Sequence, residues 1–233
     1  MKNKKMMHLA IEENSISKYV IVPSSYEWVD KIASYLEDVK VLSHFREFKT
    51  VNGKYNSKDI SICSTGNGGE SNAIAVEELY QCGARVLIRV GTTNSLKDDI
   101  RDGEVILVQN ATNYDGVSLQ YNLVEYPSIC DVELLMALED QCKESNVKYK
   151  VGSALTPINF HNSDKNINDL DLCLDLEAGS LFDVSSNLGI KSAVILGVNN
   201  INNAIDIYGE NQEVEEKIIK IALDTLTKVI KED

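Results

Sequence analysis

Short apolar runs alternate with amphipathic stretches along the chain. The apolar runs are typical of buried strands, and they cover residues 18–23, 59–63, 86–90, 104–108, 151–156 and 193–198. Apolar residues at helical spacing predict helices over residues 24–36, 71–81, 131–145, 178–187 and 213–230. Gly83 and Gly189 each follow one of these helices, where a left-handed backbone commonly ends a helix. Residues 162–171, rich in Asn and Asp, have neither pattern and predict an exposed loop.

The order of these elements predicts the fold class. Strands that alternate with helices form an α/β sheet that is covered by helices on both faces. The length of 233 residues suits one large domain, so we expect a single domain over residues 1–233. Ligands in such folds bind at the carboxyl ends of the strands, and the candidate chemistry should therefore lie at the strand exits.

The charge balance narrows the possible partners. The chain has 23 Lys and Arg against 36 Asp and Glu, a net charge of −13, which argues against nucleic acids and anionic membranes. A local arginine cluster can still hold phosphate within such a field. No stretch is apolar enough to span a bilayer, and the basic segment 1–8 does not lead into the hydrophobic segment of a secretory signal.

The cysteines and histidines favour a reducing cytoplasm and no metal site. Five cysteines are scattered without a CxxC pair, at positions 63, 82, 130, 142 and 173. With three histidines and no HExxH or similar spacing, we do not expect a zinc site built by the protein. We expect the cysteines to serve as small core residues.

Three strand exits carry candidate chemistry. The first, residues 64–69, reads Ser-Thr-Gly-Asn-Gly-Gly between a strand and a helix. Backbone N–H groups in such a turn can approach an anion at the positive end of the helix dipole. The motif is neither a Walker loop nor GxGxxG, so ATP and NAD are not implied. A tight turn that needs glycine for its dihedral angles explains the same residues, and it is favoured when the motif is taken alone.

The second exit places a cation at the end of a buried strand. Arg89 stands late in the apolar run 86–90, and Thr92 and Thr93 follow it. A buried arginine needs an anionic partner, so this pattern suggests a clamp for an oxyanion or a phosphate. An internal salt bridge with one of the many carboxylates is the alternative, and the pattern leaves both open.

The third exit carries two carboxylates, Asp175 and Glu177, on either side of Leu176. A helix is predicted from residue 178, and a carboxylate near a helix N-terminus stabilises that helix. The functional alternative is a carboxylate that accepts hydrogen bonds from sugar hydroxyls, with Leu176 as a neighbouring apolar surface.

These stretches, in this order, resemble the hexameric nucleoside phosphorylase family, in particular its uridine phosphorylase branch. The similarity is carried by residues 63–79, 89–93, 115–119, 125–127 and 131, with matches in type and spacing at 8–9 and 46–48. It implies a single-domain three-layer α/β/α sandwich with a central mixed sheet flanked by helices. It also implies that inorganic phosphate, as co-substrate, attacks the anomeric carbon of a nucleoside to give ribose 1-phosphate and free base, without a cofactor.

The resemblance assigns the phosphate contacts to particular residues. Arg89, Thr92 and Gly66 would bind phosphate within one subunit. Arg46 would reach the phosphate of a neighbouring subunit, and His8 would reach the neighbour's 5′-hydroxyl. Because two of these residues act across an interface, the resemblance implies a homo-oligomer, either a dimer or a hexamer built as a trimer of dimers.

The resemblance also places residues on the sugar and the base. Glu177 would accept from the 2′- and 3′-hydroxyls, next to Asp175 and with Leu176 in place of the family's methionine. Phe160 would pack on the sugar or base, and Thr93 would line the same substrate site. The positions assigned to catalysis are Arg89, Glu177 and Asn200.

Four departures from the family pattern bear on activity. Residues 24–28, Ser-Ser-Tyr-Glu-Trp, replace Gly-Asp-Pro-x-Arg, and losing that arginine should weaken phosphate binding roughly 10–150-fold. Asp164 and Asn166 replace the Gln-x-Arg pair that reads uracil. Asn200 stands where purine-acting relatives carry an Asp, and asparagine cannot act as a general acid. The segment 160–177 is shorter than in the phosphorylases of this branch.

Three functional hypotheses remain open at this point. The first is an active nucleoside phosphorylase with an altered base preference, because the residues for phosphate and sugar are largely present. The second is a nucleoside hydrolase of the same fold, since one phosphate arginine is missing and the base segment is short. The third is a homologue that binds a nucleoside without turnover. None of the three involves a nucleic acid or a membrane.

Overall fold

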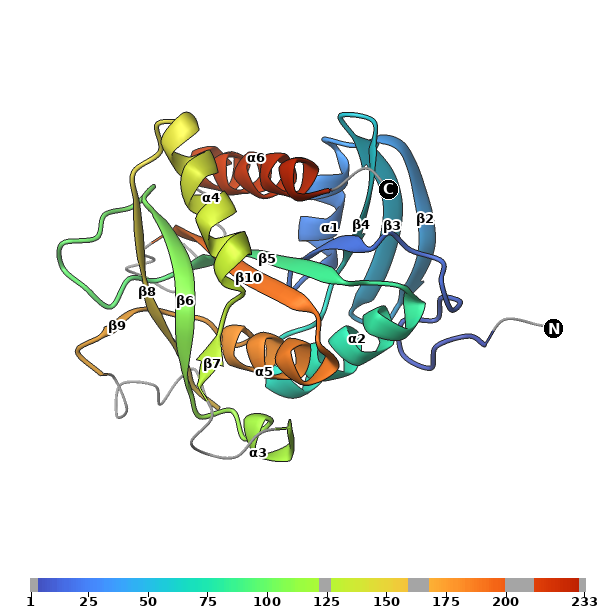
Figure 1. Ribbon diagram of the computed structural model, residues 1–233, viewed down its shortest axis with the longest axis horizontal. Coiled ribbons are helices and arrows are strands. Elements are labelled where there is room, and N and C mark those ends of the chain that lie inside the picture. Colours follow the sequence, from blue (N-terminus) through green and yellow to red (C-terminus); the bar gives the residue numbers. More distant parts are fainter. Residues whose placement is uncertain (1–3, 122–126, 159–167, 200–211, 231–233) are drawn as a thin grey trace.

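The computed structural model describes residues 4–121, 127–158, 168–199 and 212–230. The strands of these residues form one mixed sheet (Figure 1), in the order β2 (Glu37–Phe45), β3 (Phe48–Tyr55), β4 (Lys58–Cys63), β1 (Tyr19–Val22), β5 (Val86–Thr93), β10 (Lys191–Val198), β6 (Val105–Asn113), β8 (Tyr149–Thr156) and β9 (Asp171–Leu174). A short strand, β7 (Ser128–Ile129), pairs with β6 outside this path.

Helices cover both faces of the sheet. In Figure 1, α1 (Tyr26–Ala33), α4 (Val132–Glu144) and α6 (Gln212–Val229) lie above the sheet, while α2 (Gly69–Cys82) and α5 (Ala178–Leu188) lie below it. A single turn, α3 (Ser118–Tyr121), packs beside α5. The three-layer α/β/α sandwich with a mixed central sheet is therefore confirmed. Within the described ranges, no helix is long and apolar enough to cross a membrane.

The strand directions bring several strand exits to one edge of the sheet. β1 runs parallel to β4 and β5, and β5 runs parallel to β10, so the carboxyl ends of these four strands meet. β10 and β6 are antiparallel, which makes the sheet mixed. The buried apolar residues of these central strands form the core between the two helical layers.

The sheet curls so that its last strand returns to its centre. The segment after β5 pairs with β9 through an isolated bridge between Ser95 and Cys173. Leu96 N donates to Leu172 O at 2.8 Å, and Thr93 Oγ1 donates to Leu174 O at 2.6 Å. The exit of β9 therefore lies against the exit of β5, although three strands, β10, β6 and β8, stand between them in the strand order.

Every predicted strand and helix is present, with some boundaries moved. The helix expected over residues 24–36 is α1, which begins at Tyr26 and ends at Ala33. Gly83 and Gly189 follow α2 and α5 with φ of 120° and 66°, as expected for residues that end helices. All five cysteines are buried, and burial raises the pKa of the Cys63 thiol to about 12.

Two parts of the sequence behave differently from the prediction. The hairpin of β2 and β3 was not predicted, because β2 is mostly exposed and lacks an apolar run. The loop expected over residues 162–171 is described only from residue 168, and the expectation is wrong for Asp171. Asp171 is fully buried at the start of β9, where Thr112 Oγ1 and Ser153 Oγ donate to its carboxylate at 2.7 and 2.8 Å.

The start of α4 gives a test of local stability. Asp131 is the N-cap of this helix and accepts a hydrogen bond from Leu134 N at 3.0 Å. Replacing it by alanine removes that bond, so D131A should lower the free energy of unfolding by about 1 kcal/mol in urea denaturation. D140A, an exposed carboxylate on the same helix, should change it by less than about 0.5 kcal/mol. Equal effects of the two variants would contradict the capping role.

Candidate functional site

A buried ion network lies where the exits of β5 and β9 meet. Arg89 on β5 is only 4% exposed, and its Nε donates to both carboxylate oxygens of Asp175, at 2.9 and 3.0 Å. Its Nη2 donates to Asp175 Oδ2 at 2.7 Å and also to Glu177 Oε2. Burial alone would lower the pKa of Arg89, but the two carboxylates raise it, so the guanidinium stays charged. The internal salt bridge is thus present.

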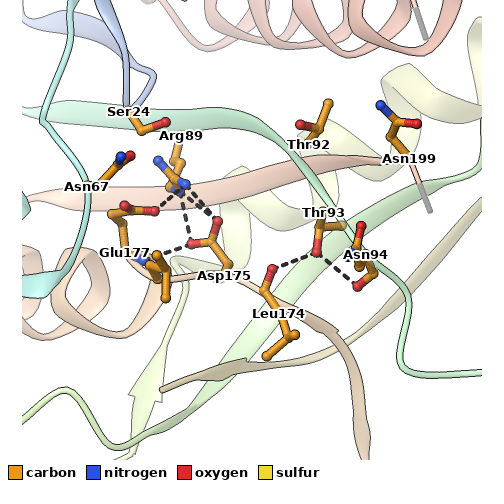
Figure 2. A pocket seen from close by; sticks show the side chains of 11 residues that line it. Ser24, Asn67, Arg89, Thr92, Thr93, Asn94, Leu174, Asp175, Glu177 and Asn199 are labelled. Atoms are coloured by element: carbon orange, nitrogen blue, oxygen red, sulfur yellow. Dashed lines mark hydrogen bonds and ion pairs between the residues drawn. The ribbon is translucent and has the colours of Figure 1, made fainter. Parts of the chain in front are cut away.

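One nitrogen of the same guanidinium is left without a partner. Arg89 Nη1 is buried, and within the described residues no atom accepts a hydrogen bond from it. Figure 2 shows this side of the guanidinium facing Ser24 and Asn67, away from the two carboxylates. Buried polar groups are rarely left unsatisfied, so an orphaned N–H at a pocket wall indicates a place for an acceptor from the ligand. The salt bridge accounts for Nε and Nη2, and the binding of an anion by Nη1 stays a prediction.

Glu177 connects this network to the glycine-rich turn. Its Oε1 accepts a hydrogen bond from Gly68 N at 2.7 Å, and its Oε2 accepts from Arg89. The side chain is almost fully buried. Burial raises the pKa of Glu177 most strongly and the charge of Asp175 adds to this, while Arg89 and the Gly68 N–H oppose it. The net direction is upward, so removing either donor would favour the protonated acid.

Asp175 stabilises the N-terminus of a helix, which is one of the two roles that the sequence allowed for the carboxylates of this segment. Its Oδ1 accepts hydrogen bonds from Glu177 N at 3.1 Å and from Ala178 N at 2.7 Å, at the first turn of α5. A carboxylate there satisfies N–H groups that have no partner inside the helix. Asp175 therefore stabilises the helix start and also orients Arg89.

The glycine-rich turn shapes one wall of the site. Gly66 has φ of 74°, and a Cβ there would lie 2.2 Å from Ser71 Oγ, so the turn requires glycine. Its N–H donates to Ser24 O at 2.9 Å. The turn places Asn67 in the pocket and aims Gly68 N at the carboxylate of Glu177. Gly66 itself holds the backbone, and its role in phosphate binding stays a prediction.

These residues surround a cavity of about 330 Å³, which suits a small molecule. Figure 2 shows the ionised groups at one end of the cavity and hydroxyl and amide groups at the other. Two of the cavity residues, Thr93 and Asn199, are joined through a backbone hydrogen bond of 2.9 Å between neighbouring strand exits. The cavity is lined by Ser24, Asn67, Arg89, Thr92, Thr93, Asn94, Leu174, Asp175, Leu176, Glu177 and Asn199.

The structure gathers most of the predicted site residues and leaves others apart. Those found together in the cavity are Arg89, Thr92, Thr93, Asp175, Leu176 and Glu177. His8 and Arg46 do not line it, because His8 bonds to Glu78 on α2 and Arg46 lies at the exposed turn between β2 and β3. Phe160 and Asn200 lie outside the described residues.

Sequence reasoning missed several lining residues. It treated Ser24 only as a departure from a family motif, and it gave Asn67 no role of its own within the turn. Asn94 and Asn199 directly follow β5 and β10, so the rule that ligands bind at the ends of parallel strands could have found both. For Leu174, at the end of β9, the sequence held no comparable indication that the residue lines the cavity. In the described part of the chain, no group of three His, Cys, Asp or Glu side chains could hold a metal.

Comparison with known proteins agrees with this fold. The model of the Phosphorylase superfamily matches residues 18–232. A guanosine phosphorylase from Halorubrum lacusprofundi is 31% identical and covers 96% of this chain and 98% of its own length. A uridine phosphorylase from Thermococcus kodakarensis is 30% identical over 92% of this chain and 85% of its own length.

Solved structures also show similarity to nucleoside phosphorylases. The crystal structure of uridine phosphorylase from Vibrio fischeri matches with a TM-score of 0.88 and 31% identity, covering 98% of this chain and 99% of that one. A purine nucleoside phosphorylase from Toxoplasma gondii, 23% identical, shares the fold with a TM-score of 0.86 over 98% of each chain. The chain belongs to the phosphorylase superfamily, and the resemblance inferred from its motifs is confirmed.

The ion network should make Arg89 important for folding as well as for binding. R89M would leave the buried carboxylates of Asp175 and Glu177 without their cation. Breaking a buried ion pair on one side typically costs about 3–5 kcal/mol, and urea denaturation at neutral pH should show a loss of this size. R101M, at an exposed arginine, should unfold like the unmodified protein. An R89M protein of unchanged stability would show that the network contributes nothing to folding.

Proposed function

We propose that this protein is a nucleoside phosphorylase that transfers the ribosyl group of a nucleoside to inorganic phosphate. The observation that carries the proposal is the unpartnered Nη1 of Arg89, beside the carboxylate of Glu177, in one small cavity. The first supplies a cationic donor for phosphate, and the second supplies an acceptor for sugar hydroxyls. The names of the guanosine and uridine phosphorylase relatives support the same chemistry.

The reaction needs positioning and electrostatic stabilisation more than a protein nucleophile. A phosphate oxygen forms a bond to the anomeric carbon while the bond from that carbon to the base nitrogen breaks. The electron pair of the broken bond leaves with the base, which then takes up a proton. Glu177 would accept from the 2′- and 3′-hydroxyls, and Arg89 would hold the phosphate beneath the sugar. The negative charges of Glu177 and of the phosphate held by Arg89 would stabilise the positive charge that develops on the sugar in the transition state.

The phosphate subsite of this chain would rely on neutral donors. Arg89 is one positive charge against the two carboxylates that it touches. The hydroxyl of Ser24 and the amide of Asn67 line the cavity beside Nη1, and neither has a hydrogen-bond partner among the described residues. Thr92 adds a second, exposed hydroxyl. We place the phosphate beside Nη1, Ser24 and Asn67, with Thr92 toward the other end of the cavity (Figure 2).

Among the described residues, neither Arg85 nor Lys97 takes the place of the arginine missing from residues 24–28. Arg85 donates to the carbonyl oxygens of Tyr80 and Ala84, and Lys97 donates to Asp169 O at 2.6 Å. Neither Arg85 nor Lys97 lines the cavity. A cation from a neighbouring subunit is therefore the expected complement to Arg89.

We propose that Arg46 and His8 lie on one surface that supplies this complement. The His8 ring meets the ring of Phe48 edge-on, with centroids 6.5 Å apart, and Phe48 is two residues from Arg46. Met7 is 78% exposed beside this surface, and the Arg46 guanidinium lies 5.2 Å from the exposed Phe45 ring. An apolar, basic surface of this kind suits an interface. We propose a homo-oligomer, a dimer or a trimer of dimers, in which this surface completes a neighbour's cavity.

The base would be recognised by uncharged groups in the part of the cavity that is described. Thr93, Asn94 and Asn199 lie at the end opposite the ion network. Amides and hydroxyls can both donate and accept, so they fit the edge of a neutral nucleobase. We therefore propose a base preference that differs from uridine phosphorylases, and the cavity favours no single base.

A nucleoside hydrolase is the second candidate. The observation in its favour is the electrostatic balance of the cavity, where two carboxylates face a single guanidinium. Such a balance weakens the binding of a phosphate dianion and leaves water as the competing acceptor.

The direct test is base release from uridine, thymidine, inosine, guanosine and adenosine, each with and without phosphate. We expect at least one nucleoside to release its base only when phosphate is present. Equal release without phosphate would assign the protein as a hydrolase. No release at high enzyme concentration would overturn both assignments and leave a binding protein.

The neutral donors can be tested separately. S24A and N67A should each raise the KM for phosphate roughly 2–12-fold, the value of one lost hydrogen bond, while the KM for the nucleoside changes little. S25A provides a matched control, because the neighbouring Ser25 does not line the cavity. Unchanged phosphate KM in both variants, or an equal rise in both KM values, would remove Ser24 and Asn67 from the phosphate subsite.

A further inference from the structure

A buried carboxylate on α2, that of Glu78, accepts hydrogen bonds from the N-terminal segment. Glu78 is 8% exposed and does not line the cavity. Its Oε2 accepts hydrogen bonds from Leu9 N at 2.8 Å and from His8 N at 3.1 Å. Its Oε1 pairs with His8 Nδ1 at 2.8 Å and lies 3.1 Å from His8 N. The bonds to this carboxylate therefore converge on two consecutive residues.

These bonds determine how the His8 ring is presented. The backbone bonds fix the main chain at His8, and the bond to Nδ1 fixes the rotation of the imidazole. Because a carboxylate only accepts, Nδ1 carries the proton, and the second ring nitrogen, Nε2, is the one directed away from Glu78. The ring is also held edge-on against Phe48. Its side chain remains 30% exposed, so the ring is fixed but accessible.

We infer that Glu78 is a positioning residue, which orients His8 so that Nε2 can reach the 5′-hydroxyl of a nucleoside bound by a neighbouring subunit. The inference rests on the proposed function and deepens it. Glu78 would touch neither substrate nor phosphate. It would set the direction and the tautomer of a ring that does, as carboxylates commonly do for functional histidines.

The ionisation of Glu78 is consistent with this role. Burial raises the pKa of the Glu78 carboxyl, but hydrogen bonds from Leu9 N–H and from the ring and N–H of His8 outweigh burial and lower it. The carboxylate is therefore ionised at neutral pH and can accept from all these donors at once. Glutamine has a single acceptor oxygen and could not replace it fully.

The two possible roles of Glu78, as a structural anchor or as a positioning residue, lead to different expected results. An anchor affects the stability of the N-terminal segment and influences all substrates equally. A positioning residue affects those substrates that carry the hydroxyl which His8 reads. The contrast is measured by comparing a nucleoside with its 5′-deoxy analogue, because the two differ in that hydroxyl alone.

The experiment uses the full-length protein and the nucleoside that the release assay identifies. If that nucleoside is uridine, kcat/KM is measured for uridine and for 5′-deoxyuridine, and the corresponding pair is used for a purine nucleoside. The variants are E78Q, H8A, the double variant, and E77Q as a matched control. Glu77 is the next residue on α2 and accepts from Tyr121 Oη at 2.6 Å.

We expect E78Q to lower kcat/KM for the 5′-hydroxy nucleoside about tenfold, the low end for a charged hydrogen bond, with little change for the 5′-deoxy analogue. H8A should show the same selectivity, the double variant should add nothing further, and E77Q should leave the ratio unchanged. Thermal unfolding and size-exclusion chromatography of E78Q report separately whether the fold and assembly persist.

Three outcomes would overturn the inference. Equal losses on both substrates in E78Q would mark Glu78 as an anchor, while H8A would still support the proposed function. Loss of selectivity in H8A but not in E78Q would show that His8 acts without Glu78. An H8A protein that treats both substrates like the unmodified protein would remove His8 from the proposed function, and Glu78 with it.

Discussion

The contact between one guanidinium and two carboxylates underlies both the fold and the site. Arg89, Asp175 and Glu177 are all buried, and charges are stable there only when they are paired and hydrogen-bonded. Their pairing joins β5, in the middle of the sheet, to the segment after β9, at its end. It also connects the start of α5 to the turn before α2 through Gly68. The curl of the sheet and the shape of the cavity both depend on this network.

Local motifs made much of the site predictable. Arg89 and Glu177 stand at strand exits, where ligands of α/β folds bind, and their chemistry was visible in the sequence. Sequence reasoning could not decide between a salt bridge and a phosphate clamp, because the answer depends on which nitrogen faces the cavity. Asp171 was misjudged as exposed, since its hydroxyl partners come from distant strands. The β2 and β3 hairpin escaped prediction because an exposed edge strand carries no apolar run.

The electrostatic balance of the cavity bears on how this protein would bind phosphate. A single cation faces two carboxylates, so phosphate would depend on neutral donors and on a basic surface from another subunit. The proposed surface comprises Arg46, His8 and nearby exposed apolar residues. Glu78 accepts a hydrogen bond from Nδ1 of His8 and so fixes the orientation of the ring. In the proposed function, a cation from a neighbouring subunit would replace the arginine that residues 24–28 lack. Activity would then depend on assembly.

The central claim is that phosphate, and not water, receives the sugar. Phosphorus-31 NMR of a reaction containing enzyme, inorganic phosphate and the cleaved nucleoside tests it directly. We expect a new phosphate-ester signal, that of ribose 1-phosphate or its deoxy analogue, which grows in equal amount with the released base. Release of base with free sugar and an unchanged inorganic phosphate signal would contradict it.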